Sequence, residues 1–207
     1  MKSLFTFIAL MCLCAAYATA GPKEDFALFR NGEKQAWDST GHEKSKGISM
    51  KISYPRTWKA MEGSRPNIVQ KFASDAGRGV EMVMIITKAL PREITLSEKQ
   101  EFLSVDAAKD LISDGGRLVS HKKTKIDGED CAMIEAEDVR ERVGQKIASK
   151  TLTFIIPRKD VLLIIQCATG GDASPGFDAI RKHYDEVKPL FLLISSSCVL
   201  TDKWKTP

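Results

Sequence analysis

Residues 131–168 read CAMIEAEDVRERVGQKIASKTLTFIIPRKDVLLIIQCA, and they predict three consecutive strands of one antiparallel sheet. Small or apolar side chains alternate with polar ones in 131–140 and again in 146–156, after the turn at Gly144. Residues 161–168 are apolar at nearly every position, which is typical of a central strand covered on both faces. Short connections between these strands require antiparallel pairing. We expect the carboxylates of the first strand, Glu135 and Glu137, to face solvent.

Further strands are predicted upstream of this segment. Residues 117–126 form one strand, which the Asp127-Gly128 turn connects to the next. Period-two or apolar patterns also predict strands near 48–54, 67–73 and 80–87.

Two segments have helical periodicity. Residues 97–113 predict a single helix that begins with a capping box between Ser97 and Gln100. Residues 176–194 predict a C-terminal helix with apolar positions spaced 3-4-3-4-3. The predicted fold class is therefore α+β: an antiparallel β-sheet meander packed with an inserted helix and a C-terminal helix.

The N-terminus has the pattern of a secretory signal peptide over residues 1–20. Lys2 is followed by the apolar run 4–16, and small residues precede an expected cleavage between Ala20 and Gly21. The run is too short to span a bilayer, which takes about 20 residues. A lipoprotein anchor is the alternative, but Cys12 and Cys14 lack the small preceding residue that such an anchor requires. We expect an exported protein, periplasmic or secreted, without a stable membrane anchor.

The remainder of the chain fits one domain. Residues 21–46 are polar and predict a flexible N-terminal arm, the folded domain occupies 47–198, and 199–207 form a short C-terminal tail. The net charge is +4 for the whole chain, too mild for the basic footprint of a nucleic-acid-binding protein. No spacing of cysteines and histidines indicates a metal site, and no motif indicates a cofactor.

Three cysteines remain after signal cleavage. In a meander, Cys131 and Cys167 lie near opposite ends of the sheet, because a strand rises about 3.3 Å per residue. A C-terminal helix that runs back along the last strand returns Cys198 to the end where Cys131 lies. We therefore predict a Cys131–Cys198 disulfide, with Cys167 buried and unpaired.

A first strand that ends in Tyr54-Pro55, with Trp58 soon after, resembles the opening of PsbP-like domains, and the later Ile126-Asp127-Gly128 turn fits the same pattern. This superfamily shares its fold with the Ran-binding Mog protein and with bacterial periplasmic proteins and secretion chaperones. The resemblance covers about residues 47–195. It implies an α-β-α sandwich and a mostly non-enzymatic role, with Tyr54, Pro55 and Trp58 packing the first turn. No catalytic or metal-binding residues carry over.

A basic strip is the remaining candidate site. It consists of Arg117, His121, Lys122, Lys123 and Lys125 on one predicted strand. The strip could bind an acidic protein partner. Alternatively, lysines at a sheet edge block edge-to-edge aggregation.

Catalytic alternatives have weaker support. Cys167 has no neighbouring base in the sequence, and Ser195–Ser197 lack the Gly-x-Ser-x-Gly context of a hydrolase nucleophile. The expected function is an exported, non-enzymatic binding or accessory protein that acts on a protein partner. Two alternatives stay open: an envelope immunity or chaperone-like protein for a toxin or effector, and a hydrolase with an unrecognised site.

Overall fold

The computed structural model describes residues 21–74, 80–112, 115–142, 145–173 and 176–204. The predicted signal peptide lies outside these residues, as does Ala20 of the expected cleavage site, and Gly21 is the first residue described. The turn at Gly144 is also outside them.

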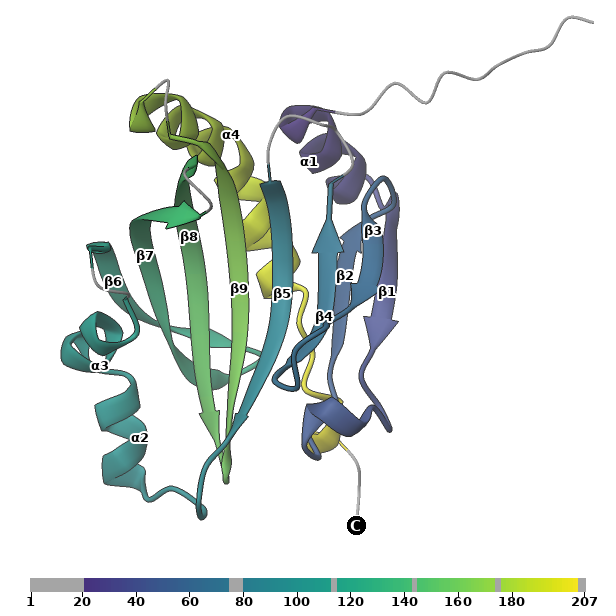
Figure 1. Ribbon diagram of the computed structural model, residues 1–207. Coiled ribbons are helices and arrows are strands. Elements are labelled where there is room, and N and C mark those ends of the chain that lie inside the picture. Colours follow the sequence, from purple (N-terminus) through teal and green to yellow (C-terminus); the bar gives the residue numbers. More distant parts are fainter. Residues whose placement is uncertain (1–20, 75–79, 113–114, 143–144, 174–175, 205–207) are drawn as a thin grey trace, which may run out of the picture.

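Two sheets organise the chain (Figure 1). The larger has seven antiparallel strands in the order β3-β4-β5-β9-β8-β7-β6, and the smaller pairs β1 with β2. The strands are β1 (Lys34–Asp38), β2 (Lys51–Pro55), β3 (Lys59–Glu62), β4 (Ile68–Ala73), β5 (Val80–Ala89), β6 (Arg117–Ile126), β7 (Glu129–Arg142), β8 (Gln145–Arg158) and β9 (Val161–Asp172). The helices are α1 (Pro22–Arg30), α2 (Leu96–Phe102), α3 (Val105–Asp110) and α4 (Phe177–Ser196), with short 3-10 turns η1 (Glu43–Ser45) and η2 (Thr201–Lys203).

The predicted α+β meander is confirmed, with one rearrangement of order. Strands β6 to β9 form the meander, and β9 lies in the middle of the sheet because its free edge pairs with β5. The near-continuous apolar run of β9 fits this central position. The chain between β5 and β6 therefore crosses from the middle of the sheet to its far edge, and it carries α2 and α3 on the way (Figure 1).

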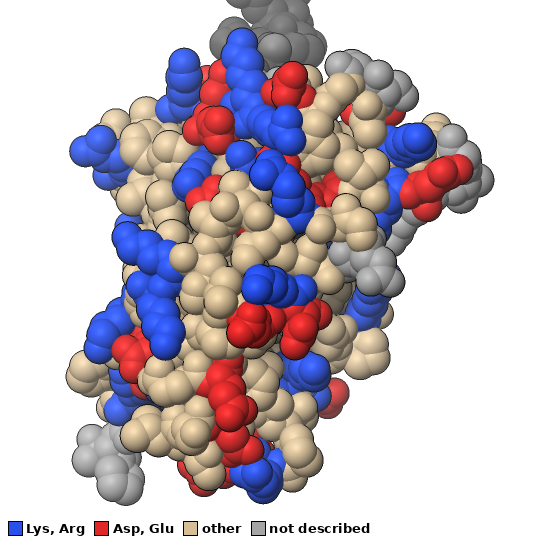
Figure 2. Space-filling view, turned by 90° about the vertical axis from the view of Figure 1, so that its left-hand side faces the viewer, with Lys and Arg blue, Asp and Glu red and all other residues tan. Residues whose placement is uncertain are grey.

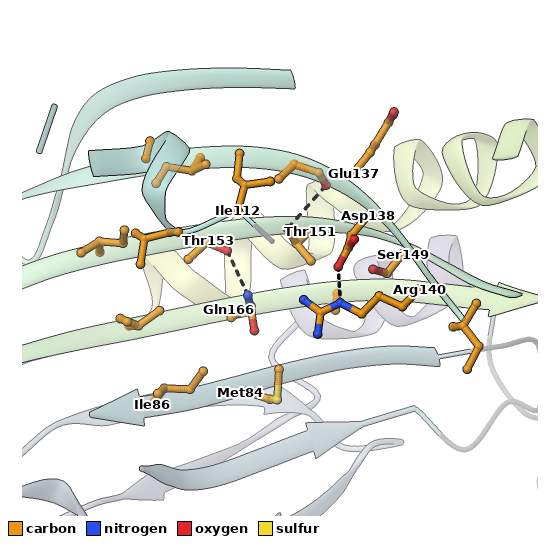
Figure 3. A pocket seen from close by; sticks show the side chains of 18 residues that line it. Met84, Ile86, Ile112, Glu137, Asp138, Arg140, Ser149, Thr151, Thr153 and Gln166 are labelled. Carbon is orange, nitrogen blue, oxygen red and sulfur yellow. Dashed lines mark hydrogen bonds and ion pairs between the residues drawn. The ribbon is translucent and has the colours of Figure 1, made fainter. Parts of the chain in front are cut away.

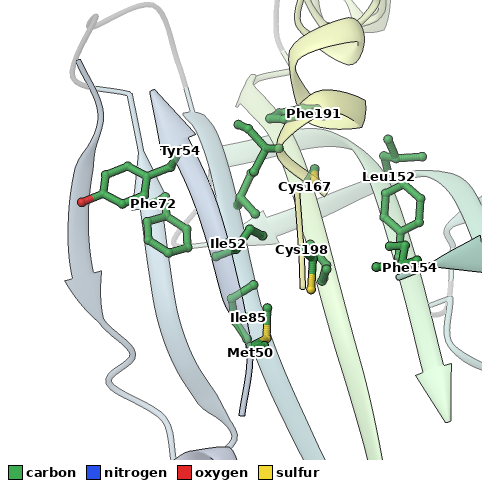
Figure 4. Close-up of a cluster of buried hydrophobic side chains, with 14 of the residues drawn as sticks. Met50, Ile52, Tyr54, Phe72, Ile85, Leu152, Phe154, Cys167, Phe191 and Cys198 are labelled. Atoms are coloured by element: carbon green, nitrogen blue, oxygen red, sulfur yellow. The ribbon is translucent and has the colours of Figure 1, made fainter. Parts of the chain in front are cut away.

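The main core lies between the sheet and α4. Tyr184, Val187 and Phe191 of α4 are fully buried against inward-facing side chains of β8 and β9, such as Leu152 and Leu163. Ile52 of β2 and Met50, which directly precedes that strand, complete this core from the side of the smaller sheet (Figure 4). The 3-4-3-4-3 spacing thus marks the face that α4 buries.

A second, smaller core lies on the opposite face of the sheet. Leu103 and Ala108 from the α2–α3 region pack there against Ala132, Ile134 and Ile155. Helices on both faces make the α-β-α arrangement that the sequence predicts.

The single helix predicted for residues 97–113 is instead two helices, and residue 113 lies outside the described residues. Ser104 breaks the segment because its hydroxyl accepts a hydrogen bond from the Ala107 amide and caps α3. The capping box also differs from the expected one. It joins Thr95 and Glu98 rather than Ser97 and Gln100.

The N-terminal segment differs from the flexible arm predicted for residues 21–46. It contains α1, β1 and η1, and α1 packs against α4 and β2. Phe29 of α1 is buried in the main core. Asp25 helps to hold α1 in place on the rest of the fold. Its carboxylate accepts hydrogen bonds from the Thr57 hydroxyl and, at 3.1 Å, from the Trp58 indole N–H.

Candidate functional site

Strand β6 lies at one end of the seven-stranded sheet and pairs only with β7 among the described strands. It is 10 residues long, whereas β3 at the opposite end has 4. The outer edge of an end strand presents backbone N–H and C=O groups that no neighbouring strand uses. The predicted basic strip lies along this long edge.

The strip does not form one continuous surface. A shift in register between Leu118 and Ser120 changes the alternation along β6. Arg117 consequently shares the α4 face with Lys122, which lies opposite Met133 of the main core. His121, Lys123 and Lys125 lie on the opposite face, where α2 and α3 pack. The cations of the predicted basic strip are therefore divided between the two faces of the sheet.

Several of these side chains have partners. Arg117 Nη2 lies 2.7 Å from Glu137 Oε2, and Lys125 Nζ lies 3.3 Å from Asp130 Oδ1. Lys123 donates to Gln100 Oε1 at 3.0 Å, and a ring nitrogen of His121 lies 3.1 Å from the Leu103 carbonyl oxygen. Among the described residues, Lys122 has no hydrogen bond or ion pair.

Figure 2 views the molecule from the side of Figure 1 on which β6 lies. Lysine and arginine side chains alternate there with acidic ones and with uncharged surface. Arg117 and Lys125 remain 62% and 68% exposed despite their partners. The Lys125–Asp130 pair is exposed on both sides, and such pairs contribute at most about 1 kcal/mol to stability, so Lys125 can exchange partners at little cost.

A row of polar side chains crosses the sheet beneath α4. Arg117, Glu137, Lys150, Thr169 and Glu81 lie opposite one another in register on β6, β7, β8, β9 and β5. The four members after Arg117 are buried. The sequence alone gives no signal for this row, because the five side chains come together only once the strands are paired.

Helix α4 supplies partners for the row and for the next buried carboxylate on β7. Arg181 donates to both carboxylate oxygens of Glu137, at 3.0 and 2.9 Å. Glu135 accepts from Lys188 at 2.6 Å and from the Tyr184 hydroxyl at 3.0 Å. The prediction that Glu135 and Glu137 face solvent is therefore wrong. One signal in the sequence could have indicated this burial: the polar side chains of Arg181, Tyr184 and Lys188 lie on one face of the predicted C-terminal helix and could bind carboxylates of the sheet.

The two carboxylates remain acidic although they are buried. Hydrogen bonds from Arg181 lower the pKa of Glu137 to about 2. Burial acts in the opposite direction, and a hydrogen bond from Arg117 lowers the pKa further. Burial by itself would raise the pKa of Glu135, but the bonds from Lys188 and Tyr184 lower it on balance. Both groups are therefore charged anchors that hold α4 on the sheet. They do not have the raised pKa of a general acid at neutral pH.

The Tyr54-Pro55 and Trp58 side chains pack within the fold, and none lines the β6 edge. Tyr54 stacks on Phe72 with ring centroids 4.5 Å apart, and its hydroxyl donates to Gln35 of β1. Trp58 is buried, and its ring packs edge-on to Phe191 of α4. All three residues are buried and join the smaller sheet to the main core.

All three cysteines of the described chain are buried free thiols, so the predicted Cys131–Cys198 disulfide is not formed in this structure. Burial raises the pKa of each thiol to about 12, and Asp127 and Cys131 add smaller contributions at Cys198. The Cys131–Cys198 disulfide therefore stays a prediction. Cys167 lies 3.5 Å from the Ser195 hydroxyl.

Cys167 does not have the surroundings of a nucleophile. A thiol is reactive as thiolate, and burial suppresses that form here. In the described parts of the chain, no group of three or more metal-ligating side chains comes together. None of the helices described there is long and apolar enough to cross a membrane.

No protein-family model and no curated protein matches the sequence. Solved structures with a similar fold include the Ran-binding protein Mog1p of Saccharomyces cerevisiae, at 8% identity and a TM-score of 0.50 over 83% of this chain and 97% of that one. Cyanobacterial PsbP (CyanoP) from Synechocystis sp. PCC 6803 is 18% identical, with a TM-score of 0.49 over 81% of this chain and 92% of that one.

A third similar structure is LpqN of Mycobacterium tuberculosis, a protein involved in cell envelope biogenesis. It is 11% identical, with a TM-score of 0.48 over 82% of this chain and 92% of that one. At these identities the likeness concerns the fold alone. The chain has the PsbP-like fold that it shares with Mog1p, as its sequence predicts.

Proposed function

We propose that this protein is an exported, non-catalytic accessory protein, and that a partner protein adds an extended acidic segment to the edge strand β6. The observation that carries the proposal is the long outer edge of β6, with which no other described strand pairs, combined with the cations of β6. Addition of a strand to an exposed sheet edge is a common mode of peptide recognition, in which backbone hydrogen bonds supply affinity.

The charges of β6 favour an acidic segment. Lys122 on the α4 face and Lys125 on the opposite face flank the edge, so a bound strand would meet a cation on either side. Charge complementarity of this kind contributes mainly to association rate and to partner choice. The aggregation-blocking role of edge lysines is compatible with it, because the same cations repel a second copy of β6.

Export is supported by the pattern of residues 1–20. A non-catalytic role is supported by the environments of the candidate nucleophiles, since the buried thiols have raised pKa values. The immunity or chaperone-like alternative differs only in the identity of the partner, which would be one toxin or effector.

The test compares two charge-reversal variants of the mature chain as bait. Lys122→Glu/Lys125→Glu alters the β6 edge, and Lys23→Glu/Lys182→Glu makes the same net change at two exposed lysines of α1 and α4. Each bait is incubated with native envelope and culture-medium fractions, and retained proteins are quantified by mass spectrometry. We expect one partner retained by wild type and control and reduced about tenfold or more by the β6 variant.

Chemical cross-linking then locates the contact. The proposal requires cross-links from Lys122 or its β6 neighbours to an acidic segment of the partner. Equal retention by both variants would exclude β6 as the binding edge. A lack of any specifically retained protein would count against the binding function as a whole.

A further inference from the structure

A groove of about 410 Å³ lies on the face of the sheet opposite α4, between α3 and strands β5, β9, β8 and β7 (Figure 3). Helices α2 and α3 cover only one side of this face. Ligand pockets in proteins usually measure about 300–1,000 Å³, so the groove is large enough for a small molecule.

One part of the groove is apolar. Met84 and Ile86 of β5 and Ile164 of β9 form its floor on one side, and Leu111 and Ile112 after α3 form a wall. Leu111 is 55% exposed. Among the described residues, no aromatic side chain lines the groove. Sugar rings and nucleobases, which bind by stacking on aromatic side chains, are therefore poor candidates.

Uncharged polar groups form a column beside this apolar part. Ser149, Thr151 and Thr153 alternate along β8, which spaces them about 6.7 Å apart on one face, and Gln166 lies opposite Thr153 on β9. Their internal hydrogen bonds are long: 3.5 Å from Thr151 to the Ala136 carbonyl and 3.5 Å from Gln166 to Thr153. Most of their hydrogen-bonding capacity is therefore left for a ligand.

The charges at the groove cancel one another. Arg140 donates from Nε to Asp138 Oδ2, and the carboxylate of Glu137 is bound by Arg181 and Arg117. Asp138 Oδ1, in contrast, is buried and has no hydrogen-bond donor among the described residues. A ligand hydroxyl or amide N–H could donate to that oxygen while Arg140 stays on the other one.

We propose that this groove binds a small uncharged amphiphile whose apolar body lies along Met84, Ile86 and Ile112 and whose hydroxyl or amide groups meet Thr151, Thr153 and Gln166. Cancellation of the nearby charges disfavours strongly anionic or cationic ligands. The site lies on the face opposite α4 and is separate from the outer edge of β6, so it does not depend on the proposed partner.

The probe is 1-decanoylglycerol, titrated below its micelle concentration into the purified mature chain and followed by calorimetry. Decanoate, which has the same acyl chain and a negative charge, is the comparison ligand. We expect saturable 1:1 binding of decanoylglycerol and binding of decanoate weaker by about tenfold or more. Non-saturable binding, or equal or tighter binding of decanoate, would overturn the proposal.

Three variants locate the binding. Thr151→Trp fills the groove and should abolish binding, whereas Lys88→Trp, at an exposed position outside the lining residues, should leave it unchanged. Thr153→Val/Gln166→Leu keeps the approximate volume and removes two polar groups. It should weaken binding about tenfold.

Circular dichroism and thermal unfolding confirm that each variant is folded, and the Thr153→Val/Gln166→Leu result stands by itself if Thr151→Trp does not fold. Undiminished binding by folded Thr151→Trp, or unchanged or tighter binding by Thr153→Val/Gln166→Leu, would contradict the site. The β6 variant Lys122→Glu/Lys125→Glu should bind the probe like wild type, which separates this test from that of the partner.

Discussion

Arg181 of α4 donates two hydrogen bonds to the carboxylate of Glu137 of β7, from Nε to Oε1 at 3.0 Å and from Nη2 to Oε2 at 2.9 Å. Arg117 of the edge strand binds the same carboxylate at 2.7 Å. A single carboxylate therefore joins the helix, the interior of the sheet and its edge. Bidentate pairs of this kind are among the strongest polar contacts in proteins.

Substitution Glu137→Gln should destabilise the fold by about 2 kcal/mol at neutral pH, because hydrogen bonds to a charged group contribute roughly 1.5–3 kcal/mol. The folded-state pKa of Glu137 is about 2, below its ordinary value of 4.5. The contribution of the Glu137 carboxylate to the free energy of unfolding is therefore complete above pH 4.5 and is lost as the pH falls towards 2. Urea unfolding of wild type and variant at several pH values measures the difference, which should shrink on acidification.

Asp178→Asn is the matched control for this experiment. Asp178 also pairs with Arg181, at 2.9 Å, but its side chain is 96% exposed. The control should change stability by less than about 0.5 kcal/mol. A difference between Glu137→Gln and wild type that stays constant or grows towards pH 2 would show that the carboxylate is not the anchor described here.

Substitution Asp25→Ala should loosen α1 and cost about 2 kcal/mol of unfolding free energy. It leaves the buried Trp58 N–H without its acceptor, and a buried unsatisfied donor costs about 1–3 kcal/mol. Hydrogen exchange of α1 amides should accelerate. The neighbouring Glu24→Ala removes an exposed carboxylate from the same helical turn and serves as the control. Equal effects of the two changes would contradict the role of Asp25.

The thiols should react slowly in the native protein. With pKa values of about 12, Cys131, Cys167 and Cys198 carry little thiolate at neutral pH, and all three are buried. A reduced sample of the mature chain, without residues 1–20, should label with Ellman's reagent only after denaturation, and then at three sites. A sample oxidised during export should yield only the Cys167 thiol. Non-reducing peptide mapping that links Cys167 to another cysteine would disprove the predicted pairing.

Pro189→Ala should stabilise α4. Pro189 lies inside the helix and is exposed, so its ring contributes little packing while its missing N–H interrupts the helical hydrogen bonding. Proline is about 3 kcal/mol less favourable than alanine in a helix interior, and we expect a gain of about 1–2 kcal/mol after the loss of its rigidity in the unfolded chain. Thermal unfolding measures the gain, and a lowered melting temperature would contradict the prediction.

The sequence was most informative where one period repeated over many residues. The alternation in β8 and the apolar stripe of α4 predicted both elements, because each buries one regular face. The segment before Gly47 was less informative. Its few apolar residues gave no repeating pattern, and its order depends on Asp25 and Phe29 reaching residues far away in sequence.

The candidate sites were harder to predict than the fold. Alternation placed Glu135 and Glu137 on one face of β7 but could not tell whether a helix covers that face. The basic residues of β6 were identified, yet the register shift near Leu118 that divides them between two faces has no signal in the sequence. The groove beside α3 brings together residues of four strands and of the α3 region, so it exists only once the strands have paired and α3 has packed on them.

The position of β9 also has a consequence for the time at which the sheet can form. Its pairing with β5 joins residues far apart in sequence, such as Val80 with Gly170, and without β9 the strands β3 to β5 have no contact with the β6–β8 meander within the sheet. A polypeptide that emerges with its N-terminus first would hold two separate parts of the sheet, β3–β5 and β6–β8, until residues 161–172 appear. For a chain translocated unfolded, this strand order delays folding until almost the whole chain has crossed, because non-local strand pairing is slow to form.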